Sequence, residues 1–187
     1  PSTAGGIAAN NNITGNTGGT ISNCYSHVDI VNNAGISAYT GGIAGSNDYE
    51  VLNCYSTGSL SSSASYQTNT GGIIGRNAVL GTTVSNCYYL EGTAAGGING
   101  SDATGRAESR SNYSFEGGEV AYLLQGQQET QVWGQDIGVD EYPVLTGDSE
   151  KAVSHKITSY AGSEERGYSE YAVAYANHNG NTILPYD

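Results

Sequence analysis

The chain has 187 residues, with 28 glycines, 15 tyrosines, one phenylalanine and no methionine, and only 13% of its residues are charged. A typical soluble domain has about 25% charged residues, so small uncharged polar side chains must cover most of this surface. Eighteen acidic residues against six basic ones give a formal net charge of −12, which excludes nucleic acid and anionic membranes as favoured partners.

Two short motifs alternate along the first hundred residues. Gly-Gly-Ile occurs at residues 5–7, 41–43 and 71–73, each time followed by an asparagine, with a degenerate fourth copy at 96–98. Asn-Cys-Tyr occurs at residues 23–25, 53–55 and 86–88, each time with a β-branched residue three places before the cysteine. Successive cysteines are 30 and 33 residues apart, and the last repeat is shortened, as a terminal repeat is expected to be.

The spacing between the two motifs also locates the insertions. From each cysteine to the next motif isoleucine the distance is 19 residues in the first two repeats, whereas from isoleucine to the following cysteine it varies between 11 and 17. We therefore expect loops of different length along one edge of the fold.

A repeat of this length, built from short β-like runs separated by Gly and Asn, cannot bury its own apolar face and must stack on copies of itself. Stacking at about 4.8 Å places like residues on like residues. The predicted ladders are Ile7, Ile43 and Ile73; Asn23, Asn53 and Asn86; and Cys24, Cys54 and Cys87. The sequence thus predicts an all-β fold, a parallel β-helix or solenoid, over residues 1–100.

A bend is expected within each Asn-Cys-Tyr motif. Ile21 and Cys24 are an odd number of positions apart, so both cannot face inward from one straight strand. Asn23 lies where the bend must fall, and asparagine tolerates the left-handed backbone conformation that such a bend requires.

The pattern Gly-Gly-Ile-x-Gly-x-Asn followed by β-branched-x-Asn-Cys-Tyr resembles the GLUG repeat, although Ala9 replaces the usual glycine of the first copy. GLUG repeats occur in tandem in large secreted or wall-attached bacterial proteins, including immunoglobulin A peptidases and adhesin-like proteins of gut bacteria. The resemblance extends through residues 118–124, 132–135 and 142–145, which are similar to the stretch that often closes such arrays. It implies a location and an architecture, with no catalytic activity in the repeats themselves.

After the repeats the composition changes. Four acidic residues precede residue 100 and ten lie between Asp102 and Glu150. Residues 119–125 have a helical pattern that ends at Gly126, and with Trp133 and residues 142–145 they are expected to cap the solenoid, so 101–150 is the predicted cap segment. Residues 151–187 alternate like two strands, predicting a β-hairpin-like extension or the start of a following domain.

The three cysteines are expected to be free and buried, because ladder side chains run parallel and do not point at each other. Their spacing, with only His27 nearby, does not fit a zinc site, and no cofactor motif is present. Calcium binding through Asp136, Asp140, Glu141 or Asp102 lacks the spacing of known calcium loops. The sequence therefore predicts no metal and no cofactor.

No zinc-peptidase helix, nucleophile elbow or Walker loop occurs, so we expect a protein that is not an enzyme. Parallel β-helices do include carbohydrate-active enzymes, and Asp48, Glu50 and Arg76 are the charged candidates within the repeat loops. A carbohydrate-active β-helix enzyme or a carbohydrate-binding module is therefore kept as the alternative.

The tyrosines Tyr25, Tyr55, Tyr88 and Tyr89 form a second kind of candidate site. A row of tyrosines beside variable loops can stack on sugars or bind a protein, although tyrosine also fits half-buried strands as packing. The expected function is a non-catalytic repeat module, adhesin-like or a stalk, on a bacterial cell surface or cell wall. Its possible partners are a host glycan or a host surface protein.

The ends of the chain are consistent with this location. No stretch approaches the ~20 apolar residues that span a bilayer, and no leader precedes the first repeat. We expect an export signal that has been removed, no membrane insertion, and covalent continuity with other domains of a larger protein.

Overall fold

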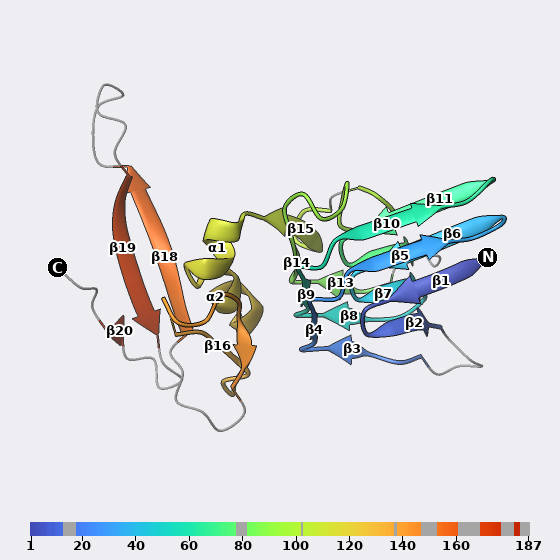
Figure 1. Ribbon diagram of the computed structural model, residues 1–187. Helices are drawn as coiled ribbons and strands as arrows, with labels where there is room; N and C mark the ends of the chain where they lie inside the picture. The colour runs from blue at the N-terminus through green and yellow to red at the C-terminus, as the bar shows by residue number, and fades with distance from the viewer. Residues whose placement is uncertain are drawn as a thin grey trace. The chain divides into compact units, whose positions relative to one another are not determined.

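The computed structural model describes residues 1–12, 18–77, 82–101, 103–136 and 138–146, and the backbone of strands at 153–160, 169–176 and 182–183. Within these residues the protein is mostly β-strand with two short helices, and its larger sheets are parallel (Figure 1). The chain divides into two compact units, Pro1–Ser111 and Asn112–Asp187, which are described separately.

The first unit is built from strands that recur once per repeat. The first set is β1 (Ser2–Gly5), β2 (Ala8–Asn11), β3 (Ile21–Ser22), β4 (Tyr25–Ser26) and β5 (Ile30–Asn33). The second set is β6 (Ser37–Gly41), β7 (Ala44–Asn47), β8 (Val51–Leu52), β9 (Tyr55–Ser56) and β10 (Leu60–Ser63). The third set is β11 (Gln67–Gly71), β12 (Ile74–Asn77), β13 (Val84–Ser85) and β14 (Cys87–Leu90).

Strands at equivalent positions pair in parallel with those of the next repeat (Figure 1). Thr40 lies between Ala4 and Thr70, and Val51 lies between Ile21 and Val84. The expected stacking of like on like is therefore present in the pairing register. The irregular repeat length is absorbed between β2 and β3, between β7 and β8, and between β12 and β13, which confirms the predicted place of the insertions.

The first unit continues past residue 100, into the segment that the sequence assigned to the cap. Strand β15 (Ala107–Arg110) pairs in parallel with β14, so that Ala107 takes the place of the next cysteine beside Cys87. The motif that marks this position in earlier repeats is lost here, because Ala and Glu replace Cys and Tyr. The sequence alone therefore did not reveal that the stack continues.

The degenerate fourth Gly-Gly-Ile copy is present, and it lies one residue out of register with the earlier copies. Ile98 pairs with Ile74, and the Gly97 carbonyl accepts a hydrogen bond from the N–H of Ile73. One repeat earlier, the Ile73 carbonyl accepts the equivalent bond from the N–H of Ile43. Gly97 thus occupies the position of the motif isoleucine. Shortening of the last repeat shifts the motif relative to the stack.

The core of the first unit lies inside the stacked strands. Ile43, Ile73, Val51, Cys54 and Cys87 are fully buried and belong to one hydrophobic cluster. The predicted isoleucine ladder is only partly buried, because Ile7, in the first repeat, is 45% exposed. Ile7 lies between β1 and β2, and each of these strands has a neighbouring strand on one side only. The side chains of the first repeat are therefore covered less completely than those of the second.

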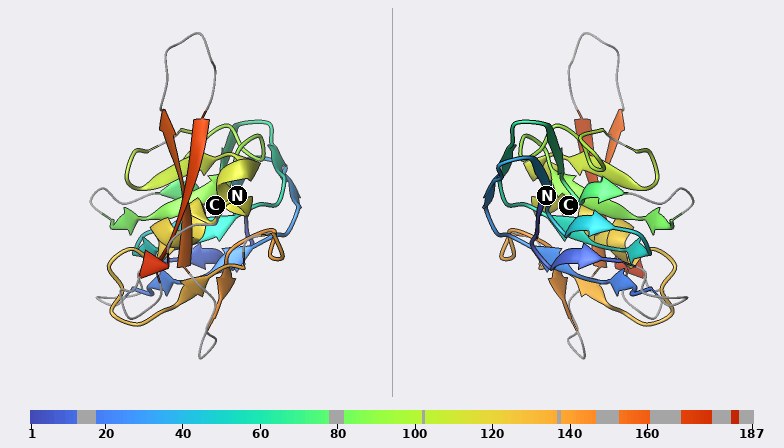
Figure 2. Two further views of the ribbon diagram at one scale, coloured as in Figure 1. Left: turned by 90° about the vertical axis from the view of Figure 1, so that its left-hand side faces the viewer. Right: turned by 90° about the vertical axis from the view of Figure 1, so that its right-hand side faces the viewer.

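The second unit contains the predicted helix, α2 (Glu119–Gln125), which ends at Gly126 as expected. A further helix, α1 (Asn112–Glu116), and the antiparallel pair β16 (Trp133–Gly134) and β17 (Val144–Leu145) accompany it. Phe115, Leu124 and Trp133 are fully buried. The predicted strand pair near the C-terminus is β18 (Val153–Tyr160) and β19 (Ser169–Ala176), antiparallel to each other and followed by β20 (Thr182–Ile183) (Figure 2).

Candidate functional site

The asparagine of each Asn-Cys-Tyr motif forms a corner of the stack. Asn23, Asn53 and Asn86 have φ angles of 51°, 52° and 56°, in the left-handed region that the bend was predicted to need. Along the ladder, the Asn86 side-chain amide donates to Asn53 Oδ1 at 3.0 Å. Asn53 and Asn86 therefore serve two structural purposes, a backbone turn and a hydrogen bond between repeats.

Replacing the middle corner residue should separate these two contributions. Asn53→Gly loses the hydrogen bond but keeps a residue that adopts positive φ without strain, whereas Asn53→Ala loses the bond and adds strain. We expect Asn53→Ala to be less stable than Asn53→Gly by about 1 kcal/mol, in urea unfolding followed by circular dichroism. Equal midpoints for the two variants would contradict the assignment of a strained corner.

A second asparagine ladder follows the Gly-Gly-Ile motif. The Asn11 side chain donates to Asn47 Oδ1 at 2.8 Å, and Asn47 donates to Asn77 Oδ1 at 3.0 Å. The ladder ends at Asn99, whose Oδ1 accepts the backbone N–H of Asn77 at 2.8 Å. Asn47 is fully buried, so these side-chain bonds satisfy polar groups that water does not reach.

The cysteines stack as predicted and are free, but only Cys54 and Cys87 are buried as expected, whereas Cys24, in the outermost repeat, is partly buried. The hydrogen bond with Cys54 and partial burial raise the pKa of the Cys24 thiol. For Cys54, the bond with Cys24 lowers the pKa, but the bond with Cys87 and burial outweigh it, and the net shift is upward. A raised pKa leaves less thiolate at neutral pH, so these thiols are poor nucleophiles and poor metal ligands.

We expect Cys24 and Cys54 of the native protein to react slowly with a thiol reagent such as Ellman's reagent at pH 8. An ordinary thiol is partly ionised at that pH, whereas a thiol with a raised pKa is ionised to a smaller extent and so reacts more slowly. In guanidinium chloride all three cysteines should react rapidly, which provides the internal control. Rapid labelling of Cys54 in the folded protein would show that the ladder opens readily.

The predicted tyrosine row is packed along the stack. Tyr25 and Tyr55 stack with ring centroids 5.3 Å apart and an interplanar angle of 7°. Tyr55 is fully buried, and Tyr88 and Tyr89 are nearly so, whereas Tyr25 is 36% exposed. Arg110 lies over the Tyr88 ring at 5.0 Å and forms an ion pair with Glu108. The open sugar-stacking row expected from the sequence is therefore not found, and packing, the other interpretation, fits the burial.

The charged candidates for catalysis do not come together. Arg76 lies over the ring of Tyr39, with Cζ 5.4 Å from the centroid, while Glu50 Oε2 accepts a hydrogen bond from Thr20 Oγ1 at 3.0 Å. No ion pair or hydrogen bond joins Asp48, Glu50 and Arg76 in the part of the chain that the structure describes.

The acidic residues considered for calcium have local structural contacts. Asp140 Oδ2 accepts the backbone N–H of Asp136 at 2.9 Å. Asp102 lies outside the described residues. Among the residues described, no group of three or more Asp, Glu, His or Cys side chains is arranged to hold a metal ion.

An exterior face that the sequence did not reveal carries an aromatic and polar cluster. Tyr39 on β6 projects from the outer side of the sheet, because its neighbours Ala38 and Thr40 are fully buried. Its hydroxyl donates to Gln67 Oε1 at 3.1 Å, and Arg76 covers its ring. Tyr66, the residue before β11, is 82% exposed. Tyr39 and Gln67 lie outside the repeated motifs and Arg76 is at a variable position of one, so only the strand register brings these three residues together.

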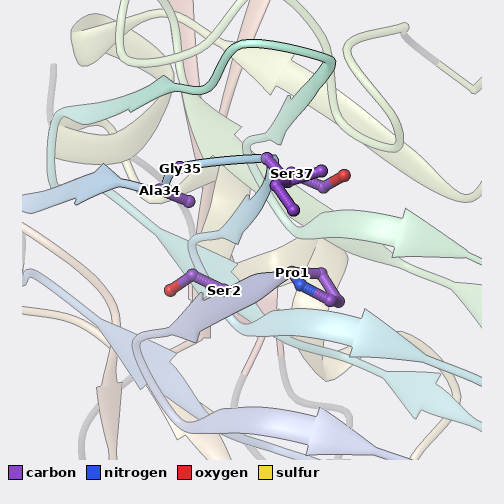
Figure 3. Close-up of a pocket in the computed structure, with 6 residues that line it drawn as sticks. Pro1, Ser2, Ala34, Gly35 and Ser37 are labelled. Carbon is purple, nitrogen blue, oxygen red and sulfur yellow. The ribbon is translucent and has the colours of Figure 1, made fainter.

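A shallow hollow of about 350 Å³ lies beside the start of β1 (Figure 3). It is lined by Pro1, Ser2, Ala34, Gly35, Ile36 and Ser37, so it has no ionisable side chain. These side chains offer no acid or base, and no nucleophile other than a serine hydroxyl without a partner base. The hollow therefore does not constitute a catalytic site.

The chain matches no protein-family model, no curated protein and no solved structure. Among the described residues, no helix combines the length and the apolar character needed to cross a bilayer.

Proposed function

We propose that the first unit is a parallel β-solenoid of GLUG-like repeats that acts as a non-catalytic extracellular module of a bacterial surface protein, a stalk or an adhesin-like spacer. The observation that carries this proposal is the residue-by-residue stacking of equivalent positions. Ser26, Ser56 and Tyr89 lie side by side, as do Ala8, Ala44 and Ile74. A fold that lengthens with each added repeat can hold a neighbouring domain at a set distance from the cell surface.

The packing of the interior supports a structural purpose. Ile43, Ile73 and Cys54 fill the space inside the strands, and the buried asparagines bond one another along the stack. Active sites in β-helix enzymes need carboxylates and basic residues that converge in a groove. Glu50 and Arg76 have separate partners, and Asp48 Oδ1 is buried without a hydrogen-bond partner. The described side chains of these three residues thus do not converge, which favours the non-catalytic interpretation.

A second candidate function is carbohydrate binding on the exterior face around Tyr39. A tyrosine ring, an arginine and an amide on one face, as Tyr39, Arg76 and Gln67 are here, are groups that contact sugar rings and hydroxyls. Tyr66, the chain neighbour of Gln67, adds a further aromatic side chain that is 82% exposed. This face replaces the Tyr25–Tyr55–Tyr88 row as the place where a glycan would bind.

A glycan array with the whole chain distinguishes the two candidates. A spacer should show no saturable binding, while an adhesin-like face should bind a defined glycan and lose that binding in Tyr66→Ala. Val139→Ala provides a matched control, because Val139 is also 82% exposed but belongs to the other unit. Release of reducing ends from a polysaccharide panel would instead show an enzyme and would contradict the proposal.

A further inference from the structure

Arg76 is a cation whose charge no neighbouring carboxylate neutralises. Its side chain is exposed on β12, and its Cζ lies 5.4 Å from the centroid of the Tyr39 ring. Although the chain carries 18 acidic residues, none of those that the structure describes lies within ion-pair distance of this guanidinium. Arg76 also donates no hydrogen bond to a described residue, so all its N–H groups are open to a ligand.

The strand register explains why the charge of Arg76 is left unpaired. Arg76 pairs with Ser46 of β7, and Tyr39 pairs with Asn69 of β11, so the neighbouring strands present uncharged side chains at these positions. The two acidic residues that follow β7 do not replace them. Glu50 Oε2 accepts a hydrogen bond from Thr20, and Asp48 Oδ1 is buried.

The Tyr39 hydroxyl orients a second donor on the same face. It donates to Gln67 Oε1 at 3.1 Å, which leaves the Nε2 amino group of Gln67 without a partner among the described residues. Gln67 is exposed, and it lies on the same side of β11 as Asn69, two residues further along. The groups that face a ligand here are therefore the N–H donors of a guanidinium and of a side-chain amide.

A carboxylate is the ligand group that suits these donors. The guanidinium fork can bind both oxygens of a carboxylate through two parallel hydrogen bonds, which are stronger than bonds to a neutral hydroxyl. The Gln67 amide can donate to a hydroxyl of the same sugar. The net charge of −12 does not prevent the approach of an anion, because at physiological salt charges more than about 8 Å away are largely screened.

We propose that the face formed by Tyr39, Gln67 and Arg76 binds an acidic sugar, one that carries a carboxylate, such as a uronic acid or a sialic acid. This proposal rests on the second candidate function, carbohydrate binding on this face. Arg76 binds the carboxylate, and Gln67 binds a hydroxyl. Tyr39 is a positioning residue that holds both side chains, through its ring and its hydroxyl.

The glycan array tests this proposal when each carboxylated glycan is placed beside its methyl ester, which keeps the sugar and removes the charge. The whole chain should bind at least one glycan that contains a uronic or sialic acid. Methyl esterification should weaken this binding by about tenfold or more, because a charge-assisted pair of hydrogen bonds is lost.

Two arginine variants locate the binding. Arg76→Gln should weaken the binding of the carboxylated glycan as much as methyl esterification does. Arg106→Gln is the matched control, because it changes the net charge equally at a partly buried arginine next to β15 and should bind like the wild type. Equal melting temperatures for Arg76→Gln and the wild type would show that the fold is intact, as expected for an exposed side chain.

The failure of this proposal differs from the failure of carbohydrate binding itself. Binding confined to neutral or sulfated glycans and lost in Tyr66→Ala would overturn the acidic-sugar proposal and leave a sugar-binding face. Carboxylated glycans that bind Arg76→Gln as well as the wild type would also overturn it. A chain that binds no glycan would contradict both proposals and favour the spacer.

Discussion

Ile43→Asp is expected to unfold the first unit. Ile43 is fully buried in the hydrophobic cluster of the middle repeat, next to Ile73. A carboxylate at this position has no buried partner and must either lose its hydration or bind a proton, both of which are costly. We expect a loss of at least about 4 kcal/mol, which is comparable to the whole stability of many domains.

The matched control is Ile7→Asp, at the equivalent position of the first repeat. Ile7 is 45% exposed, so a carboxylate there keeps much of its hydration and should cost less than about 1 kcal/mol. Urea unfolding followed by far-ultraviolet circular dichroism compares the two variants. If both had the same midpoint, the assignment of Ile43 to the core would be wrong.

Gly42→Ala is expected to cause the second-largest loss of stability, because Gly42 lies directly against Ser56 and Gly72 in the narrow interior. A methyl group on Gly42 would overlap the backbone carbonyl oxygen of Gly72 and the side chain of Ser56. Ser56 itself donates a hydrogen bond to the Gly72 carbonyl, so it cannot move away without losing that bond. Overpacking of this kind costs about 3 kcal/mol, and here the obstruction is backbone.

Gly35→Ala is the control for the change of residue type. No atom lies within 4 Å of a methyl group placed on Gly35, so the substitution should be neutral or slightly stabilising through the unfolded chain. Thermal unfolding of the two alanine variants beside the wild type measures the difference. A Gly42→Ala protein as stable as Gly35→Ala would mean that Gly42 is not in close contact with Ser56 and Gly72.

The same packing explains a motif that the sequence presented only as a pattern. Gly6 and Gly42 face Ser26 and Ser56, which occupy the position after the motif tyrosine. In the third repeat Tyr89 replaces serine, and its ring lies against Gly72. Each glycine is therefore required because a side chain 14 to 20 positions further along the chain packs against it. The fold brings the two positions together, and local sequence reasoning did not relate them.

Repetition alone allowed several features to be predicted, because a recurring motif must occupy equivalent places in a stacked structure. The left-handed Asn23, Asn53 and Asn86 followed from side-chain parity, and the position of the loops followed from the varying spacing. The helix at Glu119–Gln125 followed from its own apolar spacing and its terminal glycine. These predictions depend on local geometry or on counting residues between like motifs.

Only the tertiary structure decided which members of each ladder are enclosed and which side chains face one another. The sequence treats Ile7 and Ile43, or Tyr25 and Tyr55, as equivalent, but burial depends on having a neighbour on both sides of the stack. The continuation through β15, the register of Ile98 and the face around Tyr39 likewise arise from pairing between distant strands. A repeat pattern determines what recurs, whereas exposure and contact depend on where in the stack each copy lies.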